Sequence, residues 1–568
     1  MRLLNGETLR PFDEDGNFQA VEIGSGLRRH AVRGAGVTVL AQGLVFGAQL
    51  VSTVVLARLL MPADFGLVAM VTTFSLVLMS FGQNGYSEAI IQRPQMDRFL
   101  ASNLFWITSG AGLFLAAGFA AAGPLLARFY GDPNVTRVAV VTSLTIFLNG
   151  LSVVHIALLK RGLRFSVTST IDVLSTVLSV AISILLAMAG WKYWALVAAL
   201  IVRPVVQSLG GWGQCRWIPS LPRRVAGTGS VVRFALHVYG RFSFNYTTRN
   251  TDNLLVGWRF GPNSLGFYKK AYDLFLLPAN QLLIPVSDVV LSTLSRLERG
   301  SAEYRRYFLN GLSLLAFVGL GTGAILTLTG KDLVRLLLGA KWDAAGYVFT
   351  FFGPGIGIMM IYFTSGLLHL SIGRADRWFR WVILEFCVTI ALFCLGLRWG
   401  PVGIASAWSA SFWILFIPAF LYAGKPIHFG IKPILATVWR YILASLLAGG
   451  ASALFVHEIP FAAVPGVWGA LERIVGTNLL FAALYLGMVV LLHGGPDPLY
   501  RFARLLPEML PHIRSRAGSA RPEAPQPQDL RTEPEPVIEK AQCSKDAKIG
   551  MNQRSQLPGQ VSPHQGNR

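Results

Sequence analysis

The sequence predicts an all-α integral membrane protein with about fourteen transmembrane helices. Of its 568 residues, 53% are hydrophobic and only 14% are charged, and the mean hydropathy is +0.50. Apolar segments of about 20 residues recur along the chain, and a helix of that length spans about 30 Å of hydrocarbon. A turn motif from the first part of the chain also returns 200 residues later. Together these features predict two six-helix lobes and an appended pair of helices.

Each candidate span is an apolar segment of membrane length, and several contain Gly or Pro, which neighbouring helices accommodate in a membrane. The approximate cores of the fourteen spans are 36–57, 66–83, 103–122, 138–158, 170–189, 193–212, 231–258, 274–294, 308–329, 347–370, 381–397, 402–421, 434–456 and 474–492. The corresponding domains are an N-terminal segment (1–35), the first lobe (36–215), the second lobe (225–424), helices thirteen and fourteen (432–494), a membrane-surface segment (495–514) and a disordered tail (515–568).

Lys and Arg in the connecting loops predict the orientation. With a cytoplasmic N-terminus, about 20 basic residues fall on the cytoplasmic side and about 12 on the opposite side, as the positive-inside rule expects. An even number of spans then places the C-terminus in the cytoplasm as well. The same distribution explains the net charge of +21 without a nucleic-acid partner, because the basic residues lie in short loops and form no patch.

The internal repeat has an offset of 200 residues. Pro62 matches Pro262 and Gly66 matches Gly266, and Ser87–Glu88 matches Ser287–Asp288 further along. Six spans separate the two copies, so both copies have the same orientation in the membrane. The sequence therefore predicts a parallel repeat about an axis along the membrane normal. The alternative is that the turn was duplicated only as a folding device.

The seventh span carries an unusual number of polar side chains. At 100° per residue, one half of this helix collects eight of them. They are Arg241, Asn245, Tyr246, Thr248, Arg249, Asn250, Asp252 and Asn253. A charge at the bilayer centre costs about 2.5–3.5 kcal/mol on insertion scales, so this face must meet water, a partner helix or a ligand. We interpret it as the wall of a wet cavity. The alternative is a structural face in which Arg249 pairs with Asp252 one turn away.

Other spans contain isolated polar groups. Gln49 lies in the first span, Glu88 follows the second, Arg203 lies in the sixth, Asp288 in the eighth and Glu385 in the eleventh. Glu88 and Asp288 are near the expected cytoplasmic ends, where solvated helix ends are the alternative reading. His155, His237 and His369 are isolated, and the four cysteines have no metal-ligand spacing. We find no catalytic motif and no phosphate-binding loop, so the sequence predicts a non-enzyme without cofactor or metal.

Two segments resemble a known family. TDNLLVGWRFGPNSLGFYKKAYDLFLLP (251–278) and LARLLMPADFGLVAMV (56–71) are similar to the hallmark stretches of bacterial oligosaccharide repeat-unit flippases. These are exporters of O-antigen and exopolysaccharide within the multidrug/oligosaccharidyl-lipid/polysaccharide exporter superfamily. One departure is STLSRL at 292–297, where the family often has PALSRL. The resemblance implies two six-helix lobes around a cationic cavity that opens alternately to each side, with an undecaprenyl-diphosphate-linked oligosaccharide as substrate.

Such a substrate implies roles for the polar residues within the spans. Arginine forks suit phosphate oxygens and amides suit sugar hydroxyls. The expected substrate-binding residues are Arg203, Arg241, Asn245, Arg249, Asn250 and Gln49. The expected coupling residues, for a proton or sodium ion, are Asp252, Glu88 and Asp288. Helices thirteen and fourteen would serve the lipid tail.

The expected location is the bacterial inner membrane, with both termini cytoplasmic. Partners would be the lipid-linked oligosaccharide, membrane lipids and the polysaccharide polymerase and export machinery. Three rival functions stay open at this point. They are a multidrug or cation exporter of the same superfamily, a membrane glycan polymerase or transferase, and a scaffold without transport activity. The short loops disfavour the polymerase or transferase. Two arginines against one aspartate on the polar face of the seventh span disfavour the cation exporter.

Overall fold

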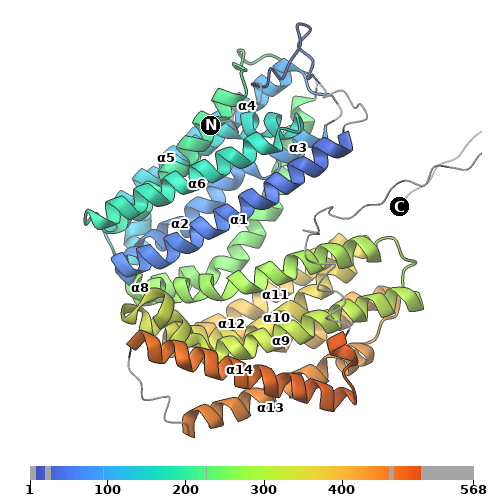
Figure 1. The fold of residues 1–568 in the computed structure, drawn as a ribbon. Helices are drawn as coiled ribbons and strands as arrows, with labels where there is room; N and C mark the ends of the chain where they lie inside the picture. Colours follow the sequence, from blue (N-terminus) through green and yellow to red (C-terminus); the bar gives the residue numbers. More distant parts are fainter. Residues whose placement is uncertain (1–7, 20–26, 94, 226, 459–465, 501–568) are drawn as a thin grey trace, which may run out of the picture. The chain divides into compact units, whose positions relative to one another are not determined.

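The computed structural model describes residues 8–19, 27–93, 95–225, 227–458 and 466–500, and this part of the chain is almost entirely helical (Figure 1). Its α-helices are α1 (Leu27–Leu59), α2 (Pro62–Gln83), α3 (Tyr86–Gln92), α4 (Arg98–Tyr130), α5 (Asn134–Arg161), α6 (Phe165–Met188), α7 (Tyr193–Gln214), α8 (Thr228–Leu294), α9 (Ala302–Leu338), α10 (Asp343–Ser371), α11 (Ala375–Gly396), α12 (Gly400–Gly424), α13 (Ile431–Glu458) and α14 (Gly466–His493). Short 3-10 turns are η2 (Ala340–Trp342), η3 (Leu397–Trp399) and η4 (Lys425–Ile427).

The membrane-spanning segments agree with the predicted fold class. Eleven stretches of the described residues are long and apolar enough to cross a membrane. One of them covers both α11 and α12, and α8 lies outside all eleven. When α11 and α12 are counted separately and α8 is counted as the two predicted spans, the total is fourteen. The chain is therefore a multi-pass membrane protein.

Element α8 consists of two helices joined at one glycine. Gly261 has φ 76° and ψ −178°, a conformation that side chains larger than hydrogen rarely adopt. It separates helix seven (228–260) from helix eight (262–294). The predicted cores of the seventh and eighth spans left a connection between residues 258 and 274, and this connection is mostly helical. Helix eight begins at Pro262, and proline suits the first turn of a helix.

The helices form two lobes of six spans and an appended pair, as predicted. Helices α1, α2 and α4–α7 supply the six spans of the first lobe, and α3 is a short helix after α2. The second lobe consists of α8–α12, and α13 and α14 pack together against α9 (Figure 1). The Tyr485 hydroxyl donates to the Phe317 carbonyl at 2.7 Å, and the Ser445 hydroxyl donates to the Leu320 carbonyl at 3.0 Å. These bonds fasten the appended pair to the second lobe.

The two copies of the repeated turn contact each other. A Cβ atom added to Gly66 would overlap the carbonyl of Pro262, and one added to Gly266 would overlap the carbonyl of Pro62. Such a reciprocal contact, in which each copy presents the same surface, is typical of a two-fold axis. The matched glycines of the predicted repeat thus serve the close approach of α2 and helix eight.

Further contacts join the lobes where α1 and α9 end. The indole nitrogen of Trp342, which is completely buried, donates to the Ala57 carbonyl at 2.8 Å. Nη2 of Arg58 donates to the Leu336 carbonyl at 2.8 Å, and Nζ of Lys341 donates to the Arg58 carbonyl at 3.1 Å. These donors satisfy carbonyls in the last turns of α1 and α9, which have no partner within their own helices. In the predicted orientation this is the periplasmic end.

A short N-terminal strap, residues 8–19, packs on the first lobe. Leu9 N–H donates to the Gln214 carbonyl at 2.9 Å, and Phe18 N–H donates to the Met96 carbonyl at 2.9 Å. Leu9 is buried, and the Arg161 guanidinium lies 4.9 Å from the Phe18 ring centre. The predicted N-terminal segment thus contains a folded part. Residues 1–7, 20–26 and 501–568, and with them the predicted tail and most of the membrane-surface segment, lie outside the described residues.

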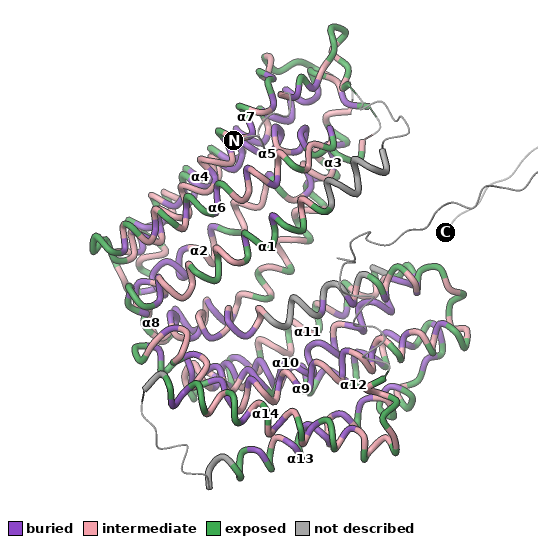
Figure 2. Tube along the Cα trace, viewed as in Figure 1, coloured by how far each residue is buried: buried purple, intermediate pink, exposed green. Residues whose placement is uncertain are grey.

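Buried and exposed residues are distributed as expected for a protein that lies in a membrane. Purple, buried positions in Figure 2 lie where helices face one another, and green, exposed positions lie on the outer faces. Many outward residues are large and apolar, such as Phe114, which is 78% exposed, and Leu454, which is 73% exposed. A soluble protein rarely exposes extended apolar surface of this kind, and lipid is its natural solvent.

Candidate functional site

Helix seven is anchored on the first lobe at its beginning. Val231 and Ala235 are buried in a cluster with residues of α3, α4 and α5. The Tyr239 hydroxyl donates to the Val77 carbonyl of α2 at 3.2 Å. Gly85, with φ 103°, permits this approach, because a Cβ there would meet the backbone of Ala235. The beginning of helix seven thus belongs to the core of one lobe, whereas its middle faces helices of the other.

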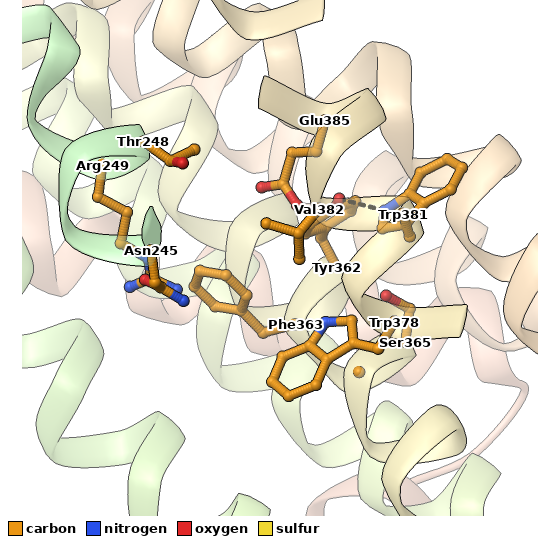
Figure 3. Close-up of a pocket in the computed structure, with 11 residues that line it drawn as sticks. Asn245, Thr248, Arg249, Tyr362, Phe363, Ser365, Trp378, Trp381, Val382 and Glu385 are labelled. Carbon is orange, nitrogen blue, oxygen red and sulfur yellow. Dashed lines mark hydrogen bonds between the residues drawn. The ribbon is translucent and has the colours of Figure 1, made fainter. Parts of the chain in front are cut away.

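The middle of helix seven, with α10 and α11, lines a pocket (Figure 3). The lining side chains from helix seven are Asn245, Thr248 and Arg249. From α10 and α11 they are Tyr362, Phe363, Ser365, Trp378, Trp381, Val382 and Glu385, and Gly366 adds its backbone. In Figure 3 the Glu385 carboxyl group extends from α11 toward helix seven. The pocket therefore has one cationic wall, one aromatic wall and a carboxylate.

Two of the predicted cations lie at this pocket. The guanidinium carbon of Arg249 is 5.0 Å from the centre of the Phe363 ring, and that of Arg241 is 5.5 Å from the Trp378 ring. Both arginine residues are exposed. A cation over an aromatic face gains about 0.5–1 kcal/mol at an exposed site, and the N–H edges stay available to oxygen acceptors. The two guanidinium groups are thus held without being neutralised by the rings.

The predicted amides separate into two groups. Asn245 is exposed and lines the pocket. Asn250 instead bonds within its own helix, where its amide donates to the Tyr246 carbonyl at 2.9 Å and its oxygen accepts from Asn253 at 3.1 Å. Gln49 is exposed on α1, outside the residues that line this pocket.

Arg203 is paired inside the first lobe. Its Nη2 lies 3.0 Å from Oδ1 of Asp172 on α6, and the amide of Gln207 reaches the same oxygen at 3.4 Å. The ion pair is partly exposed, with 41% of the Arg203 side chain accessible. Asp172 compensates the charge of Arg203, so this arginine adds no net positive charge to the cavity.

Asp252 faces the interior of the protein and is only 1% exposed. Its Oδ2 accepts a hydrogen bond from the Tyr268 hydroxyl of helix eight at 2.8 Å, and its Oδ1 accepts from the Asn253 N–H at 2.7 Å. Among the ion pairs of residues 8–500 that the structure describes, none joins Arg249 to Asp252. The structural alternative for helix seven, an Arg249–Asp252 pair, is therefore not what these residues form.

The other two predicted coupling acids lie away from the pocket or cannot be placed. Glu88 Oε2 accepts from the Gly85 N–H at 2.5 Å and so caps the first turn of α3. The backbone of Asp288 lies in helix eight, but its side chain lies outside the described residues.

The aromatic wall of the pocket was not predicted. Trp378 and Trp381 lie on α11, more than 100 residues beyond helix seven, so no local pattern connects them with Arg249. Glu385 did carry a signal, because a lone carboxylate within an apolar span is uncommon and marks a functional position by default. The sequence did not indicate that Glu385 and Arg249 line one pocket.

The chain is similar to known proteins of polysaccharide biosynthesis. Residues 55–346 match the family model described as polysaccharide biosynthesis protein. The succinoglycan biosynthesis transport protein ExoT of Rhizobium meliloti (strain 1021) is 24% identical over 380 residues, which cover 66% of this chain and 76% of ExoT. The lipopolysaccharide biosynthesis protein WzxC of Escherichia coli (strain K12) is 21% identical over 431 residues, covering 74% and 85% of the two chains.

The fold is similar to that of a solved transporter. The lipid II flippase MurJ, in an inward closed conformation, superposes with a TM-score of 0.63 at 16% sequence identity, covering 82% of this chain and 99% of that one. At this identity the similarity concerns the fold alone.

Proposed function

Because the chain belongs to the polysaccharide biosynthesis protein family, we propose that it is a flippase for lipid-linked oligosaccharides. It moves undecaprenyl-diphosphate-linked repeat units from the cytoplasmic to the periplasmic leaflet of a bacterial inner membrane, by alternating access of its two lobes. The product supplies the assembly of exopolysaccharide, capsule or O-antigen, in which a polymerase and export machinery are the downstream partners. The names of ExoT and WzxC, a transport protein and a lipopolysaccharide biosynthesis protein, support this assignment.

The observation that carries the proposal is the pair of guanidinium groups on helix seven. Arg249 lines the pocket and Arg241 lies over one of its tryptophans, whereas Glu385 is the only carboxylate among its described lining residues. A diphosphate presents several anionic oxygens, and planar guanidinium forks bind such oxygens in pairs. The lipid tail stays in the bilayer, so no covalent chemistry is needed.

Transport also requires a source of free energy. We propose coupling to a proton or sodium ion, for which Asp252 is the best placed of the three acids predicted from sequence. It lies on helix seven, three residues from Arg249, and bonds to helix eight across the kink at Gly261. A change in its charge would act on both helices.

A cation exporter is the second candidate function. Trp378, Trp381 and Glu385 would suit a lipophilic cation, because aromatic faces and a carboxylate both attract positive charge. Arg241 and Arg249 oppose it, since two like charges at the same pocket repel such a ligand.

The proposal is tested by substitution of Arg249. We expect Arg249→Ala to abolish polysaccharide export in a deletion strain while the protein level stays normal. Arg249→Lys should restore only part, because lysine keeps the charge but loses the planar fork. Arg128→Ala, at an exposed arginine in the last turn of α4, is the matched control and should export normally.

The readout is polysaccharide at the cell surface together with lipid-linked repeat units that accumulate inside the cell. Full export by the Arg249→Ala variant would contradict the flippase assignment. Resistance to cationic dyes that depends on Glu385 would favour the exporter instead.

A further inference from the structure

We propose that the pocket between helix seven, α10 and α11 is a subsite for one uncharged sugar ring, the ring next to the diphosphate of the lipid-linked substrate. This inference rests on the proposed function and specifies which part of the substrate enters the pocket. Its basis is the aromatic wall opposite the two arginines, which a diphosphate does not require.

The aromatic wall is rigidly held. The indole nitrogen of Trp381 donates to the Tyr362 hydroxyl at 2.7 Å, and Tyr422 stacks behind Trp381 with ring centres 5.6 Å apart. Trp381 is buried, and its ring cannot turn without breaking these contacts. A wall held in this way loses little conformational entropy when a ligand packs on it. Such preorganisation is typical of a binding site.

Trp378 is placed by a glycine. A Cβ atom at Gly366 would lie 3.3 Å from the Trp378 ring, closer than an ordinary contact, so the absent side chain leaves room for the indole. Arg241 lies over the same ring, with its guanidinium carbon 5.5 Å from the ring centre. The aromatic surface and the cation are thus direct neighbours, as are a sugar ring and the diphosphate attached to it.

The polar groups of the pocket suit sugar hydroxyls. The Tyr362 oxygen accepts the Trp381 N–H, and the Tyr362 hydroxyl itself bonds to the Glu385 carboxylate, which keeps a second oxygen for a ligand. Thr248 donates to the Phe244 carbonyl, which leaves its oxygen free to accept. Glu385 offers carboxylate oxygens, and Asn245 offers both a donor and an acceptor. A flat ring with apolar C–H faces and polar edges matches a flat aromatic wall bordered by such groups.

Glu385 decides the charge of the sugar. When the diphosphate occupies Arg241 and Arg249, a uronic acid in this pocket would bring its carboxylate close to that of Glu385, and the two like charges would repel. A neutral or N-acetylated sugar meets no such penalty and can donate hydroxyl protons to the carboxylate. Glu385 is therefore a specificity-determining residue, and acidic sugars of the repeat unit must lie outside this subsite.

The test measures lipid binding to the purified full chain in nanodiscs. The probes are a short-chain prenyl diphosphate and the same lipid carrying N-acetylglucosamine, galactose or glucuronic acid. We expect wild type to bind the two neutral glycolipids roughly tenfold more tightly than the bare lipid, the scale of a good aromatic contact. The glucuronic acid lipid should bind more weakly than the two neutral glycolipids.

The variants separate the subsite from the diphosphate site. Trp378→Ala should remove the advantage of the neutral sugars while the bare lipid still binds, although Arg241 loses the ring beneath it. Gly366→Ala should reduce that advantage. Glu385→Gln should raise the affinity for the glucuronic acid lipid, an effect that a merely structural role would not produce. Trp399→Ala, at a tryptophan that is 71% exposed, and Gly43→Ala, where no atom lies within 4 Å of the added Cβ, are the matched controls.

Three results would overturn the inference. Equal wild-type affinity for the bare lipid and both neutral glycolipids would contradict the subsite but leave the flippase assignment standing. Loss of affinity for all four lipids in Trp378→Ala would also contradict it, because the ring would then support the fold or the diphosphate site. Failure of wild type to bind any of the lipids, with tight binding of tetraphenylphosphonium, would refute the proposed function itself.

Discussion

Asp252 and Tyr268 form the buried polar contact that joins helices seven and eight. The carboxylate is 1% exposed and accepts the tyrosine proton at 2.8 Å, close to the kink at Gly261. A buried carboxylate that loses its donor keeps the full cost of its desolvation. This contact therefore has a structural consequence whether or not Asp252 also couples transport to an ion.

We expect Tyr268→Phe to lower the free energy of unfolding by about 1–3 kcal/mol, because it leaves Oδ2 of Asp252 without a donor, while Oδ1 keeps the Asn253 N–H. Asp252→Asn should lower it less, since the amide oxygen still accepts the Tyr268 proton. Thermal unfolding of purified protein in detergent measures both effects, with Tyr347→Phe, at a tyrosine that is 48% exposed, as the control.

Transport by Asp252→Asn then separates the two roles of this residue. Export close to wild type would mean that hydrogen bonding is its main contribution. A folded Asp252→Asn protein without export would support a coupling role instead.

Among the elements, α2 and helix eight make the closest approach between the lobes. Gly66 and Gly266 each lie against the backbone of the opposite copy, so an added methyl group has no flexible side chain to displace. Because the contact is reciprocal, equivalent substitutions in the two copies should have similar effects.

We expect Gly66→Ala and Gly266→Ala each to destabilise the protein by about 1–3 kcal/mol through overpacking. The melting temperature should fall by similar amounts for both variants, while Gly43→Ala on α1, where the added Cβ meets no atom within 4 Å, should have little effect. If only one of the two variants has a lower melting temperature than wild type, the reciprocal glycine contact does not hold the two lobes together.

The N-terminal strap is an element that hydropathy did not reveal. Residues 8–19 are too short and polar to form a span, yet their backbone bonds connect the segment before α4 with the end of α7. Leu9 is the apolar anchor of this strap and lies in the core cluster of the first lobe.

We expect Leu9→Ala to destabilise the protein by about 2–5 kcal/mol, the usual cost of truncating a buried leucine. Glu14→Ala, at the exposed tip of the strap, should be neutral. Thermal unfolding and limited proteolysis report the effect, and equal stability of the two variants would mean that the strap is dispensable for the first lobe.

At the scale of the whole molecule, the contacts between the ends of α1 and α9 and the reciprocal glycine contact lie at one end of the lobes. Arg58, Lys341 and Trp342 join the lobes there, and the positive-inside rule predicts that this end is periplasmic. Closure at that end is the state in which a flippase receives substrate from the cytoplasmic leaflet.

The orientation is tested by reporter fusions at Gly300, before α9, and at Gly339, directly after it. We expect the Gly300 fusion to report the cytoplasm and the Gly339 fusion the periplasm. Each site is fused once to alkaline phosphatase, which is active only in the periplasm, and once to a reporter that fluoresces only in the cytoplasm. The two reporters should give opposite signals at the same site, so each serves as the control for the other. A cytoplasmic signal at Gly339 would reverse the proposed direction of transport.

The amino-acid sequence by itself determined the number of spans, the parallel repeat and the polar face of helix seven. These features depend on local rules: the length of an apolar segment, the matched positions Pro62/Pro262 and Gly66/Gly266, and the 3.6-residue helical period. The repeated turn motif that contains Pro262 lies where the structure has the kink at Gly261.

Only the tertiary structure decided what that polar face meets. It placed Trp378 and Glu385 opposite Arg249, turned Asp252 toward Tyr268, and paired Arg203 with Asp172. Each of these contacts joins different helices, and Arg249 and Glu385 are more than 100 residues apart in the chain. Helical periodicity indicates which side chains share a face, whereas the packing of whole helices determines which faces come together.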